Sequence, residues 1–143
     1  MHPASAEARI LAGAEGLPLP VWLANRAMGG TTSASEAVLL AGDVHVVPEF
    51  LGNRAPFADP HARALIAGLG METDLDSLLA LYIAGLCGIG YGLRQIIETQ
   101  AAHGAPVQRL VISGGAGSHD LVRQILADAT GLPIFSTDRK SVV

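Results

Sequence analysis

The chain of 143 residues has a single cysteine, few charged side chains and no cluster of lysine and arginine. Cys87 has no partner for an internal disulfide, which fits a reducing compartment, and residues 1–10 lack the basic start and apolar run of a signal peptide. We therefore expect a cytoplasmic protein. The formal net charge of -4 and the scattered basic residues argue against nucleic acid or an anionic membrane as the main partner.

Long hydrophobic runs are also scarce, with one exception. Residues 77–93 carry no charge, but Asp76 and Arg94 bound this run, which is shorter than the roughly 20 residues that a membrane span needs. Because 50% of the residues are hydrophobic, disorder is excluded, and the length suits one domain with a real core. The run is therefore expected to be a buried helix, with no membrane involved.

Glycine is abundant, and the most informative glycines lie in the segment Val107–Ile134. An aliphatic run at 110–112 predicts a buried strand, and Gly114 and Gly115 predict a tight turn that a ligand can approach. Ser118 is expected to cap a helix that begins near Asp120, and Gly131 to end it. Such strand-to-helix turns often hold nucleotides, although many bind nothing.

This turn is neither of the two best-known phosphate loops, GxGxxG and GxxxxGK[ST]. Asp120 would repel a phosphate, so adenosine is the expected contact if a nucleotide binds. A valine in place of Gly115 should fill the ligand's space and resist a positive φ. The alternative is a plain turn of an α/β domain.

A second candidate is the irregular segment Glu49–Pro60, EFLGNRAPFADP. A segment of this length in a compact domain is often functional, and its polar side chains, Asn53 and Arg54 among them, could reach a ligand. The alternative is that these side chains satisfy the loop's own backbone, as Asn and Asp commonly do.

The remaining pattern is mostly helical. Residues 84, 85, 88 and 92 form a strip of small side chains on the longest expected helix, and this strip should let another element pack very closely. The expected elements are helices over Ala4–Glu15 and Leu17–Met28, a linker over Gly29–Ser33, helical turns capped by Ser35 over Ser35–Leu40, a strand over Asp43–Val47, and the longest helix from Thr73 or Asp74 to about His103.

In combination, several segments resemble the C-terminal domain of the FGGY carbohydrate kinases, most closely the D-ribulokinase branch. The resemblance covers roughly residues 43–135. It rests on PEFLGNRAPFADP at Pro48–Pro60, GLGMETDLDSLLALYIA at Gly68–Ala84, GLRQIIE at Gly92–Glu98, the pair Gly114-Gly115, and QILADATG followed by Leu-Pro at Gln124–Pro133.

The resemblance implies an α/β, actin-like ATPase (ribonuclease H-like) domain, the C-terminal half of a two-domain kinase. Its activity would be ATP-dependent phosphorylation of a pentulose, with D-ribulose favoured and Mg²⁺ accompanying ATP. Gly114, Gly115 and Ala116 would lie against adenosine. His119 stands where the family often has an adenine-contacting Asn, and a neutral imidazole can still form one hydrogen bond there.

By the same resemblance, Asn53 and Arg54 belong to a substrate-facing or interdomain loop. The catalytic general base and the terminal-phosphate turn have no counterpart here, so we expect no catalytic residue and no metal ligand in this chain. Both are expected from an N-terminal kinase domain, the main macromolecular partner. Association into a homo-oligomer is also possible, because the missing domain would leave an apolar face exposed.

These points predict a helical lead-in segment over 1–42, an incomplete kinase domain over 43–137, and a non-native tail over 138–143. We interpret the chain as a partial gene product that is inactive alone. The alternative, from another functional class, is a non-catalytic nucleotide-binding or interaction module.

Overall fold

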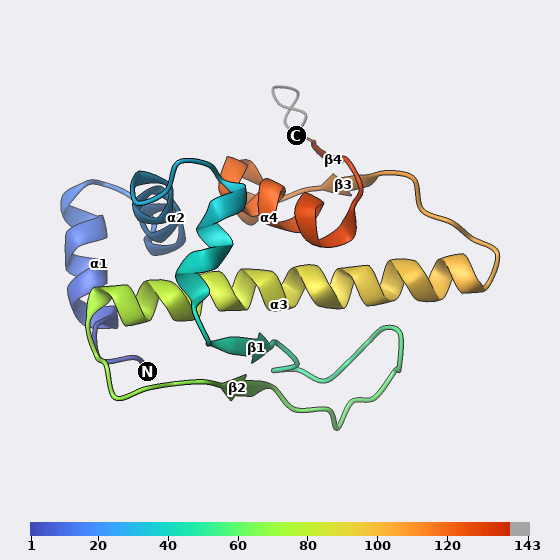
Figure 1. The fold of residues 1–143 in the computed structure, drawn as a ribbon, viewed down its shortest axis with the longest axis horizontal. Helices are drawn as coiled ribbons and strands as arrows, with labels where there is room; N and C mark the ends of the chain where they lie inside the picture. Colours follow the sequence, from blue (N-terminus) through green and yellow to red (C-terminus); the bar gives the residue numbers. More distant parts are fainter. Residues whose placement is uncertain (138–143) are drawn as a thin grey trace.

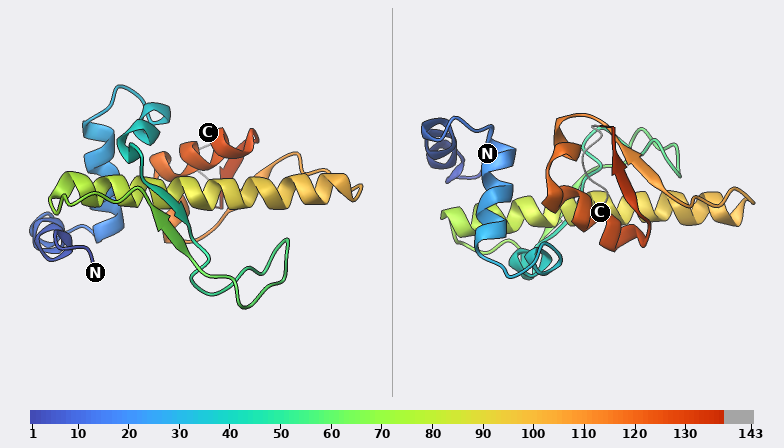
Figure 2. Two further views of the ribbon diagram at one scale, coloured as in Figure 1. Left: turned by 60° about the horizontal axis from the view of Figure 1, so that its bottom comes forward. Right: turned by 90° about the horizontal axis from the view of Figure 1, so that it is seen from above.

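The computed structural model describes residues 1–137, which are arranged around one long helix, α3 (Leu75–Ala102). Figure 1 shows α3 running across the molecule, with helical elements above it and a strand pair below it. The two turned views of Figure 2 show the same helix as the common support of the other elements. The elements over its N-terminal half are α1 (Ser5–Ala14), α2 (Leu19–Gly29) and the 3₁₀ helix η1 (Ser35–Ala41).

The limits of α3 are those that its sequence predicts. Asp74 is the N-cap, and its side chain accepts a hydrogen bond from the Ser77 backbone N–H at 2.9 Å. The hydrogen bonds from Ser77 stabilise the carboxylate and lower the pKa of Asp74. The helix ends at Ala102 with His103 as its C-cap, and Gly104 follows with a φ of 82°. Its buried apolar residues, such as Ile83, form the centre of the core.

Close packing on the small-residue strip of α3 is confirmed at Gly88. A Cβ added to Gly88 would overlap the carbonyl oxygen of Val46, so strand β1 (His45–Val47) lies directly on the helix there. At Gly85 and Gly92 the expectation is wrong, because an added Cβ would meet nothing within 4 Å. The sequence pattern did not reveal Gly90, where a Cβ would come 2.8 Å from that of Ala129.

Below α3, β1 pairs antiparallel with β2 (Leu65–Ala67), with Val46 opposite Ile66. Strand β1 falls within the predicted strand, whereas β2 was not predicted. Its side chains are all exposed, so β2 lacks the alternation of buried and exposed residues that reveals a strand in a sequence.

Above α3, the chain forms a strand–helix–strand unit, as predicted, but its first strand is not buried as expected: the side chain of Val111 is 65% exposed. Strand β3 (Leu110–Ile112) pairs in parallel with β4 (Ile134–Ser136), and α4 (Asp120–Thr130) connects them. Gly131 ends α4 in the left-handed conformation with a φ of 70°.

Two of the predicted helix caps are wrong. The N-cap of α4 is His119 and not Ser118, whose hydroxyl turns back to the carbonyl oxygen of Gly115. In η1 the N-cap is Ala34, and the hydroxyl of Ser33, not of Ser35, accepts a hydrogen bond from the Glu36 N–H at 3.3 Å. In both cases a polar side chain at a neighbouring position accepts the hydrogen bond instead.

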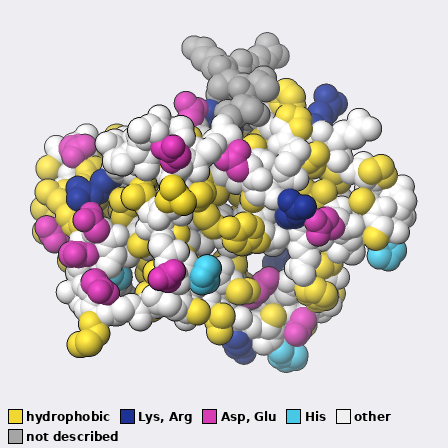
Figure 3. Space-filling view, viewed as in Figure 1, with side chains coloured by type: hydrophobic (Ala, Val, Ile, Leu, Met, Phe, Trp, Pro, Cys, Tyr) yellow, Lys and Arg dark blue, Asp and Glu magenta, His cyan; other side chains and the backbone are white. Residues whose placement is uncertain are grey.

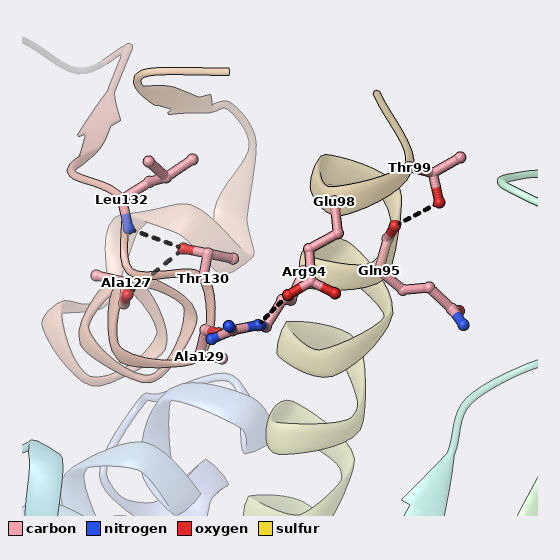
Figure 4. A network of polar contacts seen from close by, with 8 residues as sticks. All are labelled: Arg94, Gln95, Glu98, Thr99, Ala127, Ala129, Thr130 and Leu132. Carbon is pink, nitrogen blue, oxygen red and sulfur yellow. Dashed lines mark hydrogen bonds and ion pairs between the residues drawn. The ribbon is translucent and has the colours of Figure 1, made fainter. Parts of the chain in front are cut away.

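A polar network fastens the end of α4 to α3 (Figure 4). Arg94 Nε forms an ion pair with Glu98 at 2.7 Å, and Arg94 Nη1 donates to the Ala129 carbonyl oxygen at 3.4 Å. On α4, the Thr130 hydroxyl accepts from the Leu132 N–H at 3.4 Å and donates to the Leu126 carbonyl oxygen at 2.7 Å. The strand–helix–strand unit is thereby held to the central helix at the end remote from the glycine turn.

The main hydrophobic core joins residues on both sides of position 42. Ala8, Trp22 and Ala37 pack in one cluster with Ile83 and Ile125. The proposed boundaries at 42 and 137 stay predictions, and the predicted tail, 138–143, lies outside the described residues.

Helix α3 is long and apolar enough to cross a membrane by length and composition alone. The core helix of a soluble protein meets the same criterion, and α3 supports β1, η1 and α4 along its sides. The absence of a membrane partner stays an expectation.

Candidate functional site

The glycine turn leaves strand β3 and enters the short 3₁₀ helix η2 (Gly115–Ser118). Gly114 has a φ of 92°, which favours glycine, whereas Gly115 has an ordinary φ, so the positive φ expected at Gly115 is wrong. An added Cβ on either glycine would meet nothing within 4 Å. The two glycines therefore present open backbone surface, and Ala116 continues η2 beside them.

The turn is held firmly from inside the molecule. Gly117 is buried against Ile112, where an added Cβ would come within 2.7 Å of a side-chain carbon. The Ser118 hydroxyl donates to the Gly115 carbonyl oxygen at 2.6 Å, and the Gly117 N–H donates to the Gly114 carbonyl oxygen at 3.1 Å. The backbone of the turn thus has a fixed conformation while its outer surface stays open.

Arg123 of α4 completes this support, and the sequence pattern did not reveal it. Its side chain is 2% exposed, and its Nη1 donates to the Gly117 carbonyl oxygen at 2.7 Å. Its Nη2 is paired with the Asp120 carboxylate. The sequence signal that could have revealed Arg123 is its place among the apolar positions Leu121, Val122 and Ile125. An arginine buried there must have partners.

His119 lies at the end of the turn with both ring nitrogens engaged. Nδ1 accepts a hydrogen bond from the Leu121 N–H at 3.1 Å, and Nε2 lies 2.9 Å from Asn25 Oδ1 on α2. Since Nδ1 must accept, the proton belongs on Nε2. Burial lowers the pKa of His119, Arg123 lowers it further, and Asp120 opposes them. The neutral ring can stack on a ligand, but a new hydrogen bond requires it to leave Asn25.

The charge at the turn suits adenosine better than phosphate. The Asp120 side chain is 78% exposed although it is paired with Arg123, so a negative group stands at the start of α4. A phosphate placed there would be repelled.

In the second candidate segment, Asn53 is buried and its bonds stay inside the loop. Its Nδ2 donates to Glu49 Oε1 at 2.7 Å, and its Oδ1 accepts from the Phe57 N–H at 3.1 Å. These contacts favour the alternative in which Asn53 stabilises the loop. Arg54 is exposed and lines a groove of about 880 Å³ between the loop and α3.

The structure does not bring the two candidate segments together. The loop that carries Asn53 and Arg54 lies on the β1 side of α3, and the turn with Gly114, Gly115, Ala116 and His119 lies on the α4 side (Figure 1). Within residues 1–137, no three His, Cys, Asp or Glu side chains gather to hold a metal. Basic side chains are dispersed over the face shown in Figure 3, among acidic and hydrophobic ones.

Comparison with known proteins places this geometry in a family. The sequence model described as "FGGY family of carbohydrate kinases, C-terminal domain" matches residues 19–143. The chain belongs to the FGGY family. The predicted α/β fold of the family's C-terminal domain is thereby confirmed.

Two similar FGGY relatives differ in what their names specify. An FGGY carbohydrate kinase domain-containing protein from Xenopus laevis is 40% identical over 105 residues, 73% of this chain and 19% of the relative. A D-ribulokinase from Saccharomyces cerevisiae is 32% identical over 141 residues, 93% of this chain and 19% of the relative. The chain spans about a fifth of the length of these relatives.

Solved FGGY structures share the fold. A xylulose kinase from Brucella ovis superposes with a TM-score of 0.67 at 23% identity, covering 96% of this chain and 26% of the kinase. A glycerol kinase from Plasmodium falciparum, solved with ADP, gives a TM-score of 0.57 at 25% identity, covering 91% of this chain and 25% of the kinase. Kinases of this family use ATP, in line with the predicted cofactor.

Proposed function

We propose that this chain is part of an ATP-dependent pentulose kinase, with D-ribulose the favoured substrate, and that it contributes the adenosine side of the ATP cleft. The observation that carries the proposal is the turn at Gly114 and Gly115, whose backbone is fixed from inside and open outside. The similarity to a D-ribulokinase over 93% of the chain supports the choice of sugar.

The turn has the properties that an adenosine contact needs. The two glycines let the ligand approach the backbone closely. His119 offers a neutral ring for stacking beside the base. The exposed Asp120 directs the phosphates away from this end, toward the part of the cleft that another domain supplies.

The chemistry of transfer belongs to that other domain in this proposal. Mg²⁺ bound to ATP would neutralise phosphate charge, and a general base would activate the sugar hydroxyl. Arg54, exposed at its groove, remains a proposed contact to substrate or to the N-terminal kinase domain. We further propose a cytoplasmic location without membrane or nucleic-acid partners, in line with the net charge of -4.

The purified chain should bind nucleotide weakly and catalyse nothing. We expect calorimetry or NMR titration to show binding of AMP, ADP and ATP with similar affinities, because the phosphate contacts lie elsewhere, and weaker binding of GTP. Incubation with Mg²⁺-ATP and D-ribulose should release no sugar-dependent ADP. Sugar-dependent release above a blank without protein would contradict the assignment of catalysis to another domain.

The alternative of a non-catalytic module predicts a different gene. An in-frame coding sequence for an N-terminal kinase half directly upstream of Met1 would support the kinase proposal. A promoter and stop codon there would support the module, and absence of adenine-nucleotide binding would contradict the adenosine site and leave only the interaction module.

A further inference from the structure

Arg123 is the charged side chain that the fold buries most deeply at the glycine turn. Only 2% of it is exposed, although arginine is almost never fully buried unless it is paired. It belongs to the first half of α4, and its contacts lie at the N-terminal end of that helix and in η2. Because this charge is buried, it cannot serve to keep the surface soluble, and its role must lie in the contacts that it makes inside the fold.

Two contacts of Arg123 bear directly on the conformation of the turn. Nη1 donates to the carbonyl oxygen of Gly117, six residues earlier, at 2.7 Å. Nη2 is paired with Asp120, the first residue of α4. One planar guanidinium thus connects the last part of η2 with the start of α4, and the rigid separation of its two nitrogens fixes their relative position.

The position of Gly117 in turn decides the position of the open glycines. Gly117 is pressed against Ile112 of β3, and its N–H donates to the Gly114 carbonyl oxygen at 3.1 Å. Arg123 also holds Gly117, because it donates a hydrogen bond to the Gly117 carbonyl oxygen. If that hold is released, η2 can change its orientation at Gly114, which has a φ of 92°, because glycine adopts positive and negative φ with similar ease.

We propose that Arg123 is a positioning residue for nucleotide binding: through Gly117 it fixes Gly114 and Gly115 in the conformation that adenosine contacts. The inference rests on the proposed function of the turn and adds to it the residue on which its affinity depends. Arg123 touches no nucleotide itself, because it is buried beneath the turn.

Arg123→Lys is the most informative variant. Lysine keeps the charge and most of the length, but an ammonium cannot hold Gly117 and Asp120 with the same two-nitrogen geometry. We expect ATP affinity to fall about tenfold, the equivalent of one charge-assisted hydrogen bond. In ¹⁵N-labelled protein, the amide signals of Gly114 and Gly115 should move before any nucleotide is added.

Ile125→Val is the matched control, since Ile125 is buried to the same degree on the same helix and belongs to the main hydrophobic core. It should lower the melting temperature and leave ATP affinity within twofold. A second test is rescue: Arg123→Ala should recover part of its ATP affinity in millimolar guanidinium chloride but not in sodium chloride of equal ionic strength.

The outcomes separate the inference from the proposed function. If Arg123→Lys binds ATP like the parent, or if its Gly114 and Gly115 signals do not move, the positioning role is wrong. If the parent chain binds no nucleotide, the proposed function fails, and the amide signals still decide whether Arg123 sets the turn. Should Arg123→Ala fail to fold, the ATP affinity and amide signals of Arg123→Lys still decide the positioning role.

Discussion

The loop around Asn53 and the turn around Gly114 are both glycine-containing irregular segments, yet they use their polar groups in opposite ways. In the loop, the buried side chain of Asn53 forms hydrogen bonds with Glu49 and Phe57 of the same loop. In the turn, the backbone is fixed by Arg123 from beneath, and the surface above Gly114 and Gly115 stays open.

The difference shows that a polar side chain in a loop can be engaged by the loop's own groups. Asn53 was predicted to face a substrate or another domain, and in the structure its side chain forms hydrogen bonds with Glu49 and Phe57 of its own loop. The turn has no polar side chain at its two glycines. It is recognised instead by a constrained backbone with open space beside both glycines. Preorganised backbone surface is what a site for a flat base requires.

The largest effect on stability is expected where strand β1, which leads into the loop around Asn53, packs on α3. Gly88→Val should destabilise the chain by about 3 kcal/mol, because its side chain would collide with the backbone of Val46 and push β1 away. Gly85→Ala, three residues earlier on the same helix, has open space and should stabilise by up to about 1 kcal/mol. Urea denaturation of both variants measures the difference, and equal stabilities would mean that β1 does not pack on α3 as described.

A smaller effect should separate the two candidate residues of the loop. Asn53→Ala leaves the Phe57 N–H and the Glu49 carboxylate without their partner, so we expect a loss of about 2 kcal/mol. Arg54→Ala is at an exposed position and should change stability by less than about 0.5 kcal/mol. Neither should alter ATP binding by the isolated chain. A loss of ATP affinity in Asn53→Ala would make the loop part of the nucleotide site.

The smallest effect concerns pH and the turn. The pKa of His119 is lowered in the folded chain below its ordinary value of 6.5, so the unfolded chain binds a proton more readily. The stability from neutral His119 is therefore complete above pH 6.5 and is lost as the pH falls through the lowered pKa. We expect at most about 1 kcal/mol, the size of a helix cap, because protonated Nδ1 can no longer accept from the Leu121 N–H.

His119→Asn is the matched variant for this pH effect. Asparagine is a good N-cap that does not titrate, so thermal melts at pH 7.5 and pH 5.5 should differ less in the variant than in the parent. An equal difference in both proteins would show that His119 contributes nothing to the pH dependence.

Much of the fold could be predicted from local signals in the sequence. The apolar periodicity located α3, and the succession of an aliphatic run, two glycines and Gly131 located the β3–α4–β4 unit. Strand β2 could not be found, because its three residues are exposed and only pairing with β1 defines it. The choice of cap between Ser118 and His119 depends on contacts across the fold, here with Asn25, which no local pattern contains.

Several residues of the resemblance motifs form structural contacts. In GLRQIIE, Arg94 forms an ion pair with Glu98 within α3, and it also donates a hydrogen bond to the Ala129 carbonyl oxygen of α4. In QILADATG, Gln124 donates to Asp128 at 2.7 Å and Gly131 ends the helix. The family motifs pointed to the glycine turn without naming Arg123, because that residue's role depends on burial and on a carbonyl group six residues away.

The most direct test of the account is an ATP titration of the ¹⁵N-labelled chain, of Gly115→Val and of Gly13→Val. Both glycines have open surroundings and an ordinary φ, so both variants should fold, and only the valine at 115 should fill the space proposed for adenosine. We predict that ATP shifts the signals of residues 113–120 in the parent and in Gly13→Val, and that Gly115→Val loses this response. Shifts confined to other residues, or a response unchanged in Gly115→Val, would show that the turn is only structural.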